Sequence, residues 1–247
     1  MRMSIKPAFR YQFSSFLKGS AVVYVILTII AATLMLGTMY VGTDSSTTFS
    51  FTGYSIIATI FLFVMGIVNI RSDLRLCLQF GISRRTSFVS ELLAVLATSF
   101  IVAVAGELLT GIVQALSANN SKFYVADLYQ LIYAGDGTTA LTLGQHAMSA
   151  LLNISLTFCA CIGGMFFSLM FWRLNKVWTI IVAISIPLLI NIVPIILYKA
   201  GVNLEPLVTW ISSSPISFVL FFLLTAALFI IINWLLLRKA NIKEAKS

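Results

Sequence analysis

The sequence predicts an all-α protein that crosses a membrane six times, with both chain ends in the cytoplasm. The composition excludes a soluble globular domain, because 60% of the residues are hydrophobic and the mean hydropathy is +1.01. Long apolar runs recur along the chain, and each approaches or exceeds the ~20 residues that an α-helix needs to cross ~30 Å of hydrocarbon. These runs define the expected spans: 20–41, 52–70, 92–117, 145–172, 176–198 and 216–237.

The distribution of Lys and Arg predicts the orientation. With residue 1 inside, only Lys122 and Lys199 of the 16 Lys and Arg residues fall on the outside. Short cytoplasmic loops are enriched in these residues, so the chain ends are expected inside. The net charge of +8 is spread over four short cytoplasmic segments, where anionic membrane lipid accounts for it, and nucleic-acid binding is not expected. The residues expected inside are Arg2, Lys6, Arg10, Lys18, Arg71, Arg75, Arg84, Arg85, Arg173, Lys176, Arg238, Lys239, Lys243 and Lys246.

The N-terminal segment, residues 1–18, is expected to form an amphipathic interfacial helix. Apolar side chains recur at helical spacing over residues 4–17, whereas Lys6 and Arg10 occupy another face. An apolar face beside a basic face is typical of a helix that lies flat on the cytoplasmic membrane surface. The first span follows it as a retained helix, because no small-residue cleavage site follows that span.

Residues outside the spans are few, so the whole chain, 1–247, is expected to be a single transmembrane domain. The largest exterior segment is 118–144, in which helical spacing from Tyr124 to Ile132 predicts a short interfacial helix. The exterior segment 199–214 is short, and 238–247 forms a cytoplasmic tail.

Small residues within the spans predict close packing. The pair Gly163 and Gly164 in the fourth span permits close approach of another helix. Cys77, Cys159 and Cys161 lie in or beside predicted helices, in the membrane or on its cytoplasmic side, where they form no disulfide framework. We expect Cys159 and Cys161 to be small packing residues.

The cytoplasmic stretch 71–91 is the most informative part of the chain. Its pattern predicts two short helical pieces joined by a turn, with Gly81 in the left-handed position after the first helix. Ser83 is placed to cap the second helix, whose first turn holds Arg84 and Arg85. Cations at a helix N-terminus oppose the helix dipole, so they are best tolerated where they meet something negative.

The six-span layout, the amphipathic first helix and the run Phe80-Gly-Ile-Ser-Arg-Arg85 resemble ABC-2 type transporter permeases, above all the small permeases of Gram-positive bacteria. The resemblance implies a multi-pass protein of the bacterial plasma membrane whose segment between spans two and three is a coupling helix that docks onto a separate cytoplasmic ATPase. The coupling contact implied by the resemblance comprises Asp73, Arg75, Leu78, Phe80, Gly81, Ser83, Arg84 and Arg85. The short segment 199–214 departs from the larger family members, which puts a large exterior cap or re-entrant hairpin there in doubt.

The chain itself is not expected to be an enzyme or to hold a cofactor. It has no G-x-x-x-x-G-K-[ST] loop with which to cradle ATP, so ATP and Mg²⁺ would be bound by the partner ATPase. Six spans make half of the usual pathway, which implies a second copy of this chain or a related permease. Spans rich in apolar residues and poor in charge favour export of an amphipathic peptide or a lipid-like substrate.

Three polar residues within spans are candidates for a transport pathway: Glu107, Asn153 and Asn191. A carboxylate inside the membrane is costly unless it is protonated, paired or hydrated, so Glu107 is expected to face a helix interface or cavity. Interhelical hydrogen bonds are the alternative role for both asparagines. His146, the only histidine, has no neighbouring ligands at zinc-site spacing and is expected at the exterior interface.

Other functions stay open at the level of sequence. Glu107 is also what an ion-coupled secondary carrier or a channel would need, and a non-transporting membrane sensor or immunity subunit has the same layout. A membrane-embedded hydrolase is disfavoured, because the chain lacks paired intramembrane carboxylates and its single histidine lies at the membrane edge.

Overall fold

A computed structural model describes residues 5–40, 49–117, 123–134, 141–173, 196, 199 and 205–238, and nearly all of these are helical. Within them, five helices are long and apolar enough to cross a membrane, as a multi-pass membrane protein requires. The five are α1 (Ile5–Tyr40), α2 (Tyr54–Gln79), α3 (Arg84–Ser117), α4 (Leu143–Arg173) and α7 (Pro215–Arg238). Apart from Ile196, the expected span 176–198 lies outside the described residues, as does the tail after Arg238.

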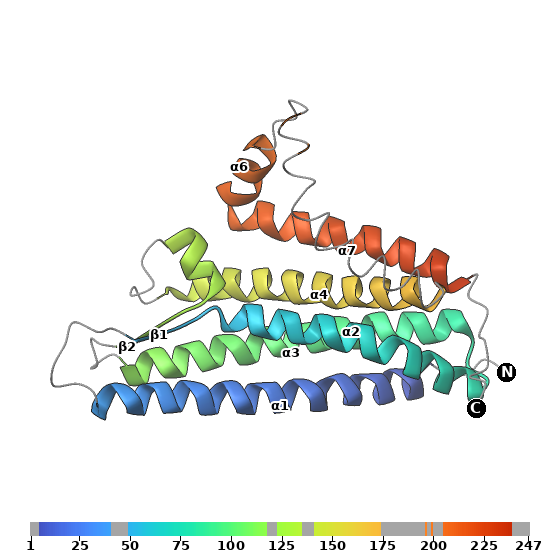
Figure 1. Cartoon of the computed structure of the whole chain (residues 1–247), viewed down its shortest axis with the longest axis horizontal. Helices are drawn as coiled ribbons and strands as arrows, with labels where there is room; N and C mark the ends of the chain where they lie inside the picture. Colours follow the sequence, from blue (N-terminus) through green and yellow to red (C-terminus); the bar gives the residue numbers. More distant parts are fainter. Residues whose placement is uncertain are drawn as a thin grey trace.

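The five long helices lie side by side in a bundle (Figure 1). Helices α1 and α3 run in one direction, and α2, α4 and α7 run in the other. The most extensive contacts are those of α2 with α4, α1 with α3, and α4 with α7. Fully buried side chains such as Leu62, Ile162 and Met165 form the core where α2 and α4 meet.

Helices α2 and α4 approach each other through glycines. A Cβ added at Gly164 would lie 2.1 Å from the carbonyl oxygen of Phe63, and one at Gly66 would lie 2.2 Å from that of Cys161. The predicted close approach is therefore confirmed at Gly164, with Gly66 as its counterpart on α2. At Gly163 the nearest atom, on Phe229, would be 3.8 Å away, which is an ordinary contact.

The N-terminal segment does not form a separate helix, so this expectation is wrong. Residues 5–17 are the first turns of α1, which continues without a break for 36 residues, or about 54 Å. Burial explains the continuity, because Gln12 and Phe16 are inaccessible to solvent and Gln12 hydrogen-bonds to α3. A helix lying flat on the membrane could not make these contacts.

The two helical pieces and the turn predicted for residues 71–91 are present, but neither piece is a helix of its own. Residues 71–79 are the last turns of α2, and residues 84–91 are the first turns of α3. Only residues 80–83 separate the two helices. The helix-turn-helix at residues 71–91 therefore consists of the ends of two long helices.

A small parallel sheet departs from the all-α expectation. Strand β1 (Phe49–Thr52) pairs with β2 (Phe123–Ala126), with Phe51 opposite Val125. Both of these side chains are buried in one cluster with Tyr54, so the sheet packs against the neighbouring ends of α1, α2 and α3. Parallel strands require a long crossover, and α2 and α3 supply it.

The other short elements lie at the same end of the bundle as the sheet (Figure 1). They are the π-helical turn η1 (Gln130–Ala134) and α6 (Glu205–Ser213). The helix expected from Tyr124 to Ile132 therefore forms only in its second half, because Tyr124 belongs to β2.

Candidate functional site

The turn between α2 and α3 is closed by backbone hydrogen bonds. The N–H of Gly81 donates to the carbonyl of Leu78 at 3.0 Å, and that of Ile82 donates to the carbonyl of Cys77 at 2.9 Å. Gly81 has φ of 71°, which confirms the left-handed conformation expected after α2. This is the Schellman arrangement, and the usual apolar contact accompanies it, since Cys77 and Ile82 share a buried cluster with Ala8.

Ser83 caps α3 as expected. Its Oγ accepts a hydrogen bond from the N–H of Thr86 at 3.1 Å, which satisfies one of the free donors at the helix start. Arg84 and Arg85 follow in the first turn of α3. Arg84 also lies 3.5 Å from the carbonyl of Arg238, so the turn contacts the end of α7.

Most residues of the expected coupling contact are accessible at this end of the bundle. Phe80 is 64% exposed, which is unusual for an aromatic side chain. Leu78 and Arg84 are half-buried, and Leu78 packs against the core. Arg75 is exposed, with its guanidinium 5.8 Å from the Trp172 ring centre. The exposed members of the set are Arg75, Phe80, Gly81, Ser83 and Arg85.

Asp73 differs from the rest of that set. It is only 2% exposed and points into the bundle rather than to the surface. Near it is Glu91 of α3, which is also fully buried and accepts a hydrogen bond from Gln12 of α1 at 3.1 Å. The Ser90 hydroxyl donates a hydrogen bond to Oε1 of the same Gln12 side chain. Asp73 therefore lies inside the bundle near a polar cluster in which Gln12 joins α1 to Ser90 and Glu91 of α3. Neither Gln12 nor Glu91 was singled out from the sequence.

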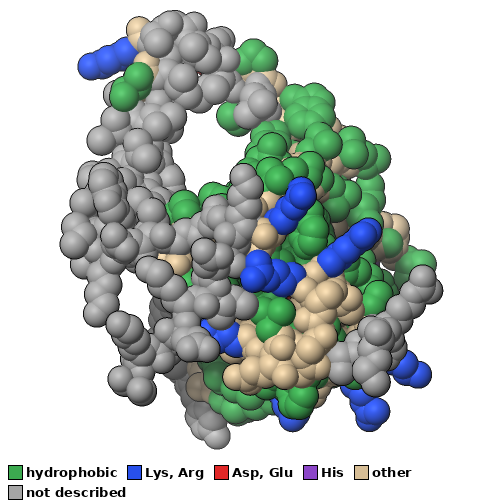
Figure 2. Space-filling model, turned by 90° about the vertical axis from the view of Figure 1, so that its right-hand side faces the viewer, with side chains coloured by type: hydrophobic (Ala, Val, Ile, Leu, Met, Phe, Trp, Pro, Cys, Tyr) green, Lys and Arg blue, Asp and Glu red, His purple; other side chains and the backbone are tan. Residues whose placement is uncertain are grey.

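A shallow apolar groove lies beside the turn. It has a volume of about 360 Å³ and lies between the first turns of α1 and the end of α2. Tyr11 on one wall and Phe80 on the other are both about half exposed or more. The view onto this end shows several Lys and Arg side chains and no acidic side chain on the described surface (Figure 2). The end of the bundle that carries the turn is thus basic with an apolar recess.

A second polar cluster lies toward the opposite end of the bundle. Glu107 of α3 pairs with His146 of α4, with 2.9 Å between Oε2 and Nδ1. Asn153, two turns along α4, donates to Glu107 at 3.5 Å and to Asp127 at 2.7 Å. Ser55 of α2 donates to the other oxygen of Asp127. One chain of hydrogen bonds therefore joins α2, α3, α4 and the segment after β2.

The burial of this cluster increases from His146 toward Asp127. The His146 and Glu107 side chains are 29% and 13% exposed, whereas Asn153 and Asp127 are buried. Glu107 therefore faces a helix interface, as predicted. The cluster places a carboxyl oxygen and an imidazole nitrogen in hydrogen-bond contact near the surface. Among the described residues no three His, Cys, Asp or Glu side chains come together as a metal site.

The sequence analysis found Glu107 and Asn153 but not their partners. His146 was expected at the exterior interface, and it lies at the same depth as Glu107 because α3 and α4 are antiparallel neighbours. Nothing in the sequence pattern singled out Asp127, because it lies outside the apolar runs and its burial depends on the β1–β2 sheet. Asn191 lies outside the described residues.

Comparison with protein-family models, with curated proteins and with solved structures finds no match to this chain.

Proposed function

We propose that the chain is the membrane-spanning subunit of an ATP-driven exporter of the ABC-2 type, and that its α2–α3 turn docks onto a separate cytoplasmic ATPase. The observation that carries the proposal is the turn itself. Two long helices hold Phe80 in an exposed position beside an apolar groove. An aromatic side chain held in this way is typical of an anchor for a protein interface, where aromatic residues and Arg are enriched.

Charge at the same end supports the proposed orientation. The ends of α2, α4 and α7 and the starts of α1 and α3 lie together there, and the described Lys and Arg residues concentrate on them (Figures 1 and 2). With this end in the cytoplasm, the chain obeys the positive-inside rule of a plasma-membrane protein. Helices α4 and α7 run in the same direction, as they would if the fifth proposed span, 176–198, lay between them.

The proposed transporter needs further subunits. The chain has no phosphate-binding loop, so ATP and Mg²⁺ would be bound by the partner. A second copy of the chain, or a related permease, would complete the pathway. The apolar spans favour an amphipathic peptide or a lipid-like molecule as the substrate.

The test is copurification of the ATPase with Phe80→Asp. A charge placed in a packed contact is costly, so we expect loss of binding and of coupled ATP hydrolysis. Leu143→Asp is the matched control, since Leu143 is 90% exposed and lies at the opposite end of the bundle. Equal retention of the ATPase by Phe80→Asp, Leu143→Asp and the native chain, all correctly inserted, would refute the docking site.

A charge test separates the cations from the apolar contact. Arg85→Gln should weaken docking at low salt more than at high salt, because exposed ion pairs are screened by salt. Asp73→Asn should leave docking intact as long as the bundle folds, since that side chain is buried.

An ion-coupled carrier is the second candidate, and the Glu107–His146 pair favours it. In such a carrier, the carboxyl of Glu107 and the adjacent imidazole would relay protons within a span. The two candidates differ in their energy source. Transport that stops on ATP depletion but persists when a protonophore collapses the proton gradient supports the exporter, and the reverse result supports the carrier. In the carrier, Glu107→Gln should abolish proton-coupled flux without loss of assembled protein.

A further inference from the structure

A second, larger groove opens on the side of the bundle between α1 and α3. Its volume is about 860 Å³, which lies within the usual range for sites that bind small molecules. The first turns of α1 form one wall with Ile5, Lys6 and Phe9. Lys6 is the one charged residue among the groove residues, and all the others are apolar.

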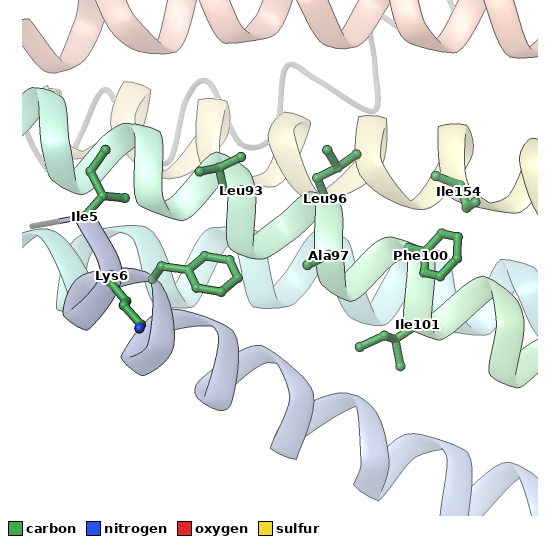
Figure 3. Close-up of a pocket in the computed structure, with 9 residues that line it drawn as sticks. Ile5, Lys6, Leu93, Leu96, Ala97, Phe100, Ile101 and Ile154 are labelled. Atoms are coloured by element: carbon green, nitrogen blue, oxygen red, sulfur yellow. The ribbon is translucent and has the colours of Figure 1, made fainter.

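The opposite wall is a continuous apolar surface of α3. Ala97 forms a low point surrounded by the larger Leu93, Leu96, Phe100 and Ile101, which are its neighbours on the helix surface. These side chains line the groove along the helix (Figure 3). The nine residues from Leu93 to Ile101 span about 12 Å, which is close to the hydrocarbon depth of one leaflet.

The groove continues to α4, where Ile154 lies at the end away from Lys6 (Figure 3). The site therefore has a cationic end at the first turn of α1 and an apolar body that extends toward the middle of the bundle. This polarity matches a lipid, with a charged headgroup at the membrane surface and an acyl chain directed inward.

We propose that this groove binds one anionic phospholipid of the leaflet that contacts the start of α1, with its acyl chain along Leu93–Ile101 and its phosphate at Lys6. Charge complementarity identifies the headgroup. Within the described part of the chain no acidic side chain forms an ion pair with Lys6, and the exposed Arg10 lies one turn away. In the orientation proposed above this is the cytoplasmic leaflet. The site itself does not depend on the transport function.

The groove lies beside the internal polar cluster of Gln12, Ser90 and Glu91, and this position gives the bound lipid a structural role. Phe9 lines the groove, and Gln12, one turn further along α1, forms the hydrogen bond to Glu91 of α3. A lipid held between α1 and α3 therefore contacts the first turns of α1. That contact lies directly beside the Gln12–Glu91 hydrogen bond, which attaches these turns to α3.

The test measures lipid retention by the full chain. The protein is reconstituted in nanodiscs that contain phosphatidylglycerol and phosphatidylcholine with identical acyl chains, and the lipids that remain bound after release are counted by native mass spectrometry. We expect one phosphatidylglycerol to be retained preferentially. Lys6→Gln should reduce that preference about fivefold, because one cation near a membrane surface contributes about 1 kcal/mol. Lys6→Arg should preserve it.

A steric pair locates the acyl chain. Ala97→Trp fills the groove and should remove the retained lipid, whereas Leu108→Trp should not, because Leu108 lies on the same helix outside the groove and is 62% exposed. Equal retention of the two lipid classes by the native chain would overturn the proposal, as would retention that Ala97→Trp leaves unchanged. A disulfide-linked dimer of Phe100→Cys that excludes lipid would show instead that a second copy covers the groove, which also overturns it.

Discussion

Adjacent glycines in α4 allow a sharp test of the packing between α2 and α4. Gly163 and Gly164 are consecutive and both helical, yet only Gly164 faces the backbone of α2. The substitution Gly164→Ala places a Cβ 2.1 Å from the carbonyl oxygen of Phe63, whereas Gly163→Ala meets nothing closer than a ring carbon of Phe229 at 3.8 Å. The two variants therefore add the same methyl group with the same effect on helix propensity.

The cost at Gly164 follows from the separation that the new methyl group requires. Close C···O contacts in proteins begin at about 3.3 Å, so the two helices must move apart by about 1 Å. The opposing atoms belong to the backbone and cannot rotate away. A gap of about 0.5–1 Å removes about a quarter to a half of each contact energy across it. A loss of about 1 kcal/mol from each of Leu62, Ile162 and Met165 gives about 3 kcal/mol, the upper end of the range for overpacked cores.

Reversible unfolding of the purified chain in mixed detergent micelles measures this difference, with tryptophan fluorescence and near-ultraviolet circular dichroism as signals. We expect Gly164→Ala to lower the free energy of unfolding by about 3 kcal/mol. Gly163→Ala should be neutral or stabilising by up to about 1 kcal/mol, because alanine favours a helix more than glycine does. If both variants have the same stability, then the α2–α4 contact is not as close as described.

Three further predictions concern the two polar clusters and the turn. Gly81→Ala should lower the free energy of unfolding by about 1–2 kcal/mol, because an added Cβ meets no atom there and only the left-handed backbone is strained. Gly111→Ala within α3 is the control and should not destabilise the fold, and thermal unfolding of both variants measures the difference. Asn153→Leu should cost about 1.5–3 kcal/mol in an unfolding titration, since it removes a hydrogen bond to a buried carboxyl group, and equal stability of variant and native chain would contradict the cluster. Gln12→Leu should leave Glu91 without its hydrogen-bond donor and destabilise the first turns of α1. Amide hydrogen exchange over residues 5–17 should then be faster than in the native chain, and unchanged exchange would contradict the prediction.

Local chemistry accounts for what the sequence predicted well at the turn. A glycine after an amphipathic helix end and a serine before the next one act within a few residues, so Gly81 and Ser83 could be assigned without knowledge of the fold. The predicted helical pieces on either side of the turn are the ends of the longer helices α2 and α3. Arg71, Asp73 and Arg75 mark the end of an apolar run, but the helix does not have to end where the run ends.

The buried polar partners could not be assigned in the same way. Which face of a helix meets its neighbour is visible in a soluble protein because the outer face is polar. In a membrane the outer face is as apolar as the core, so the rotation of α3 that directs Glu91 and Glu107 inward leaves little trace in the pattern. Asp127 adds a second difficulty, since its burial depends on pairing between strands that lie more than 70 residues apart.

The sequence by itself determined that the chain is a multi-pass membrane protein, where five of its long apolar helices lie, the asymmetry of charge and the chemistry of the α2–α3 turn, because each depends on properties of consecutive residues. The tertiary structure alone decided that α1 continues through the N-terminal segment, that Asp73 is internal, and that Glu107 pairs with His146. These features depend on which helices are neighbours and how each is rotated about its axis. Packing across helix interfaces sets both of these, and no local run of residues encodes it.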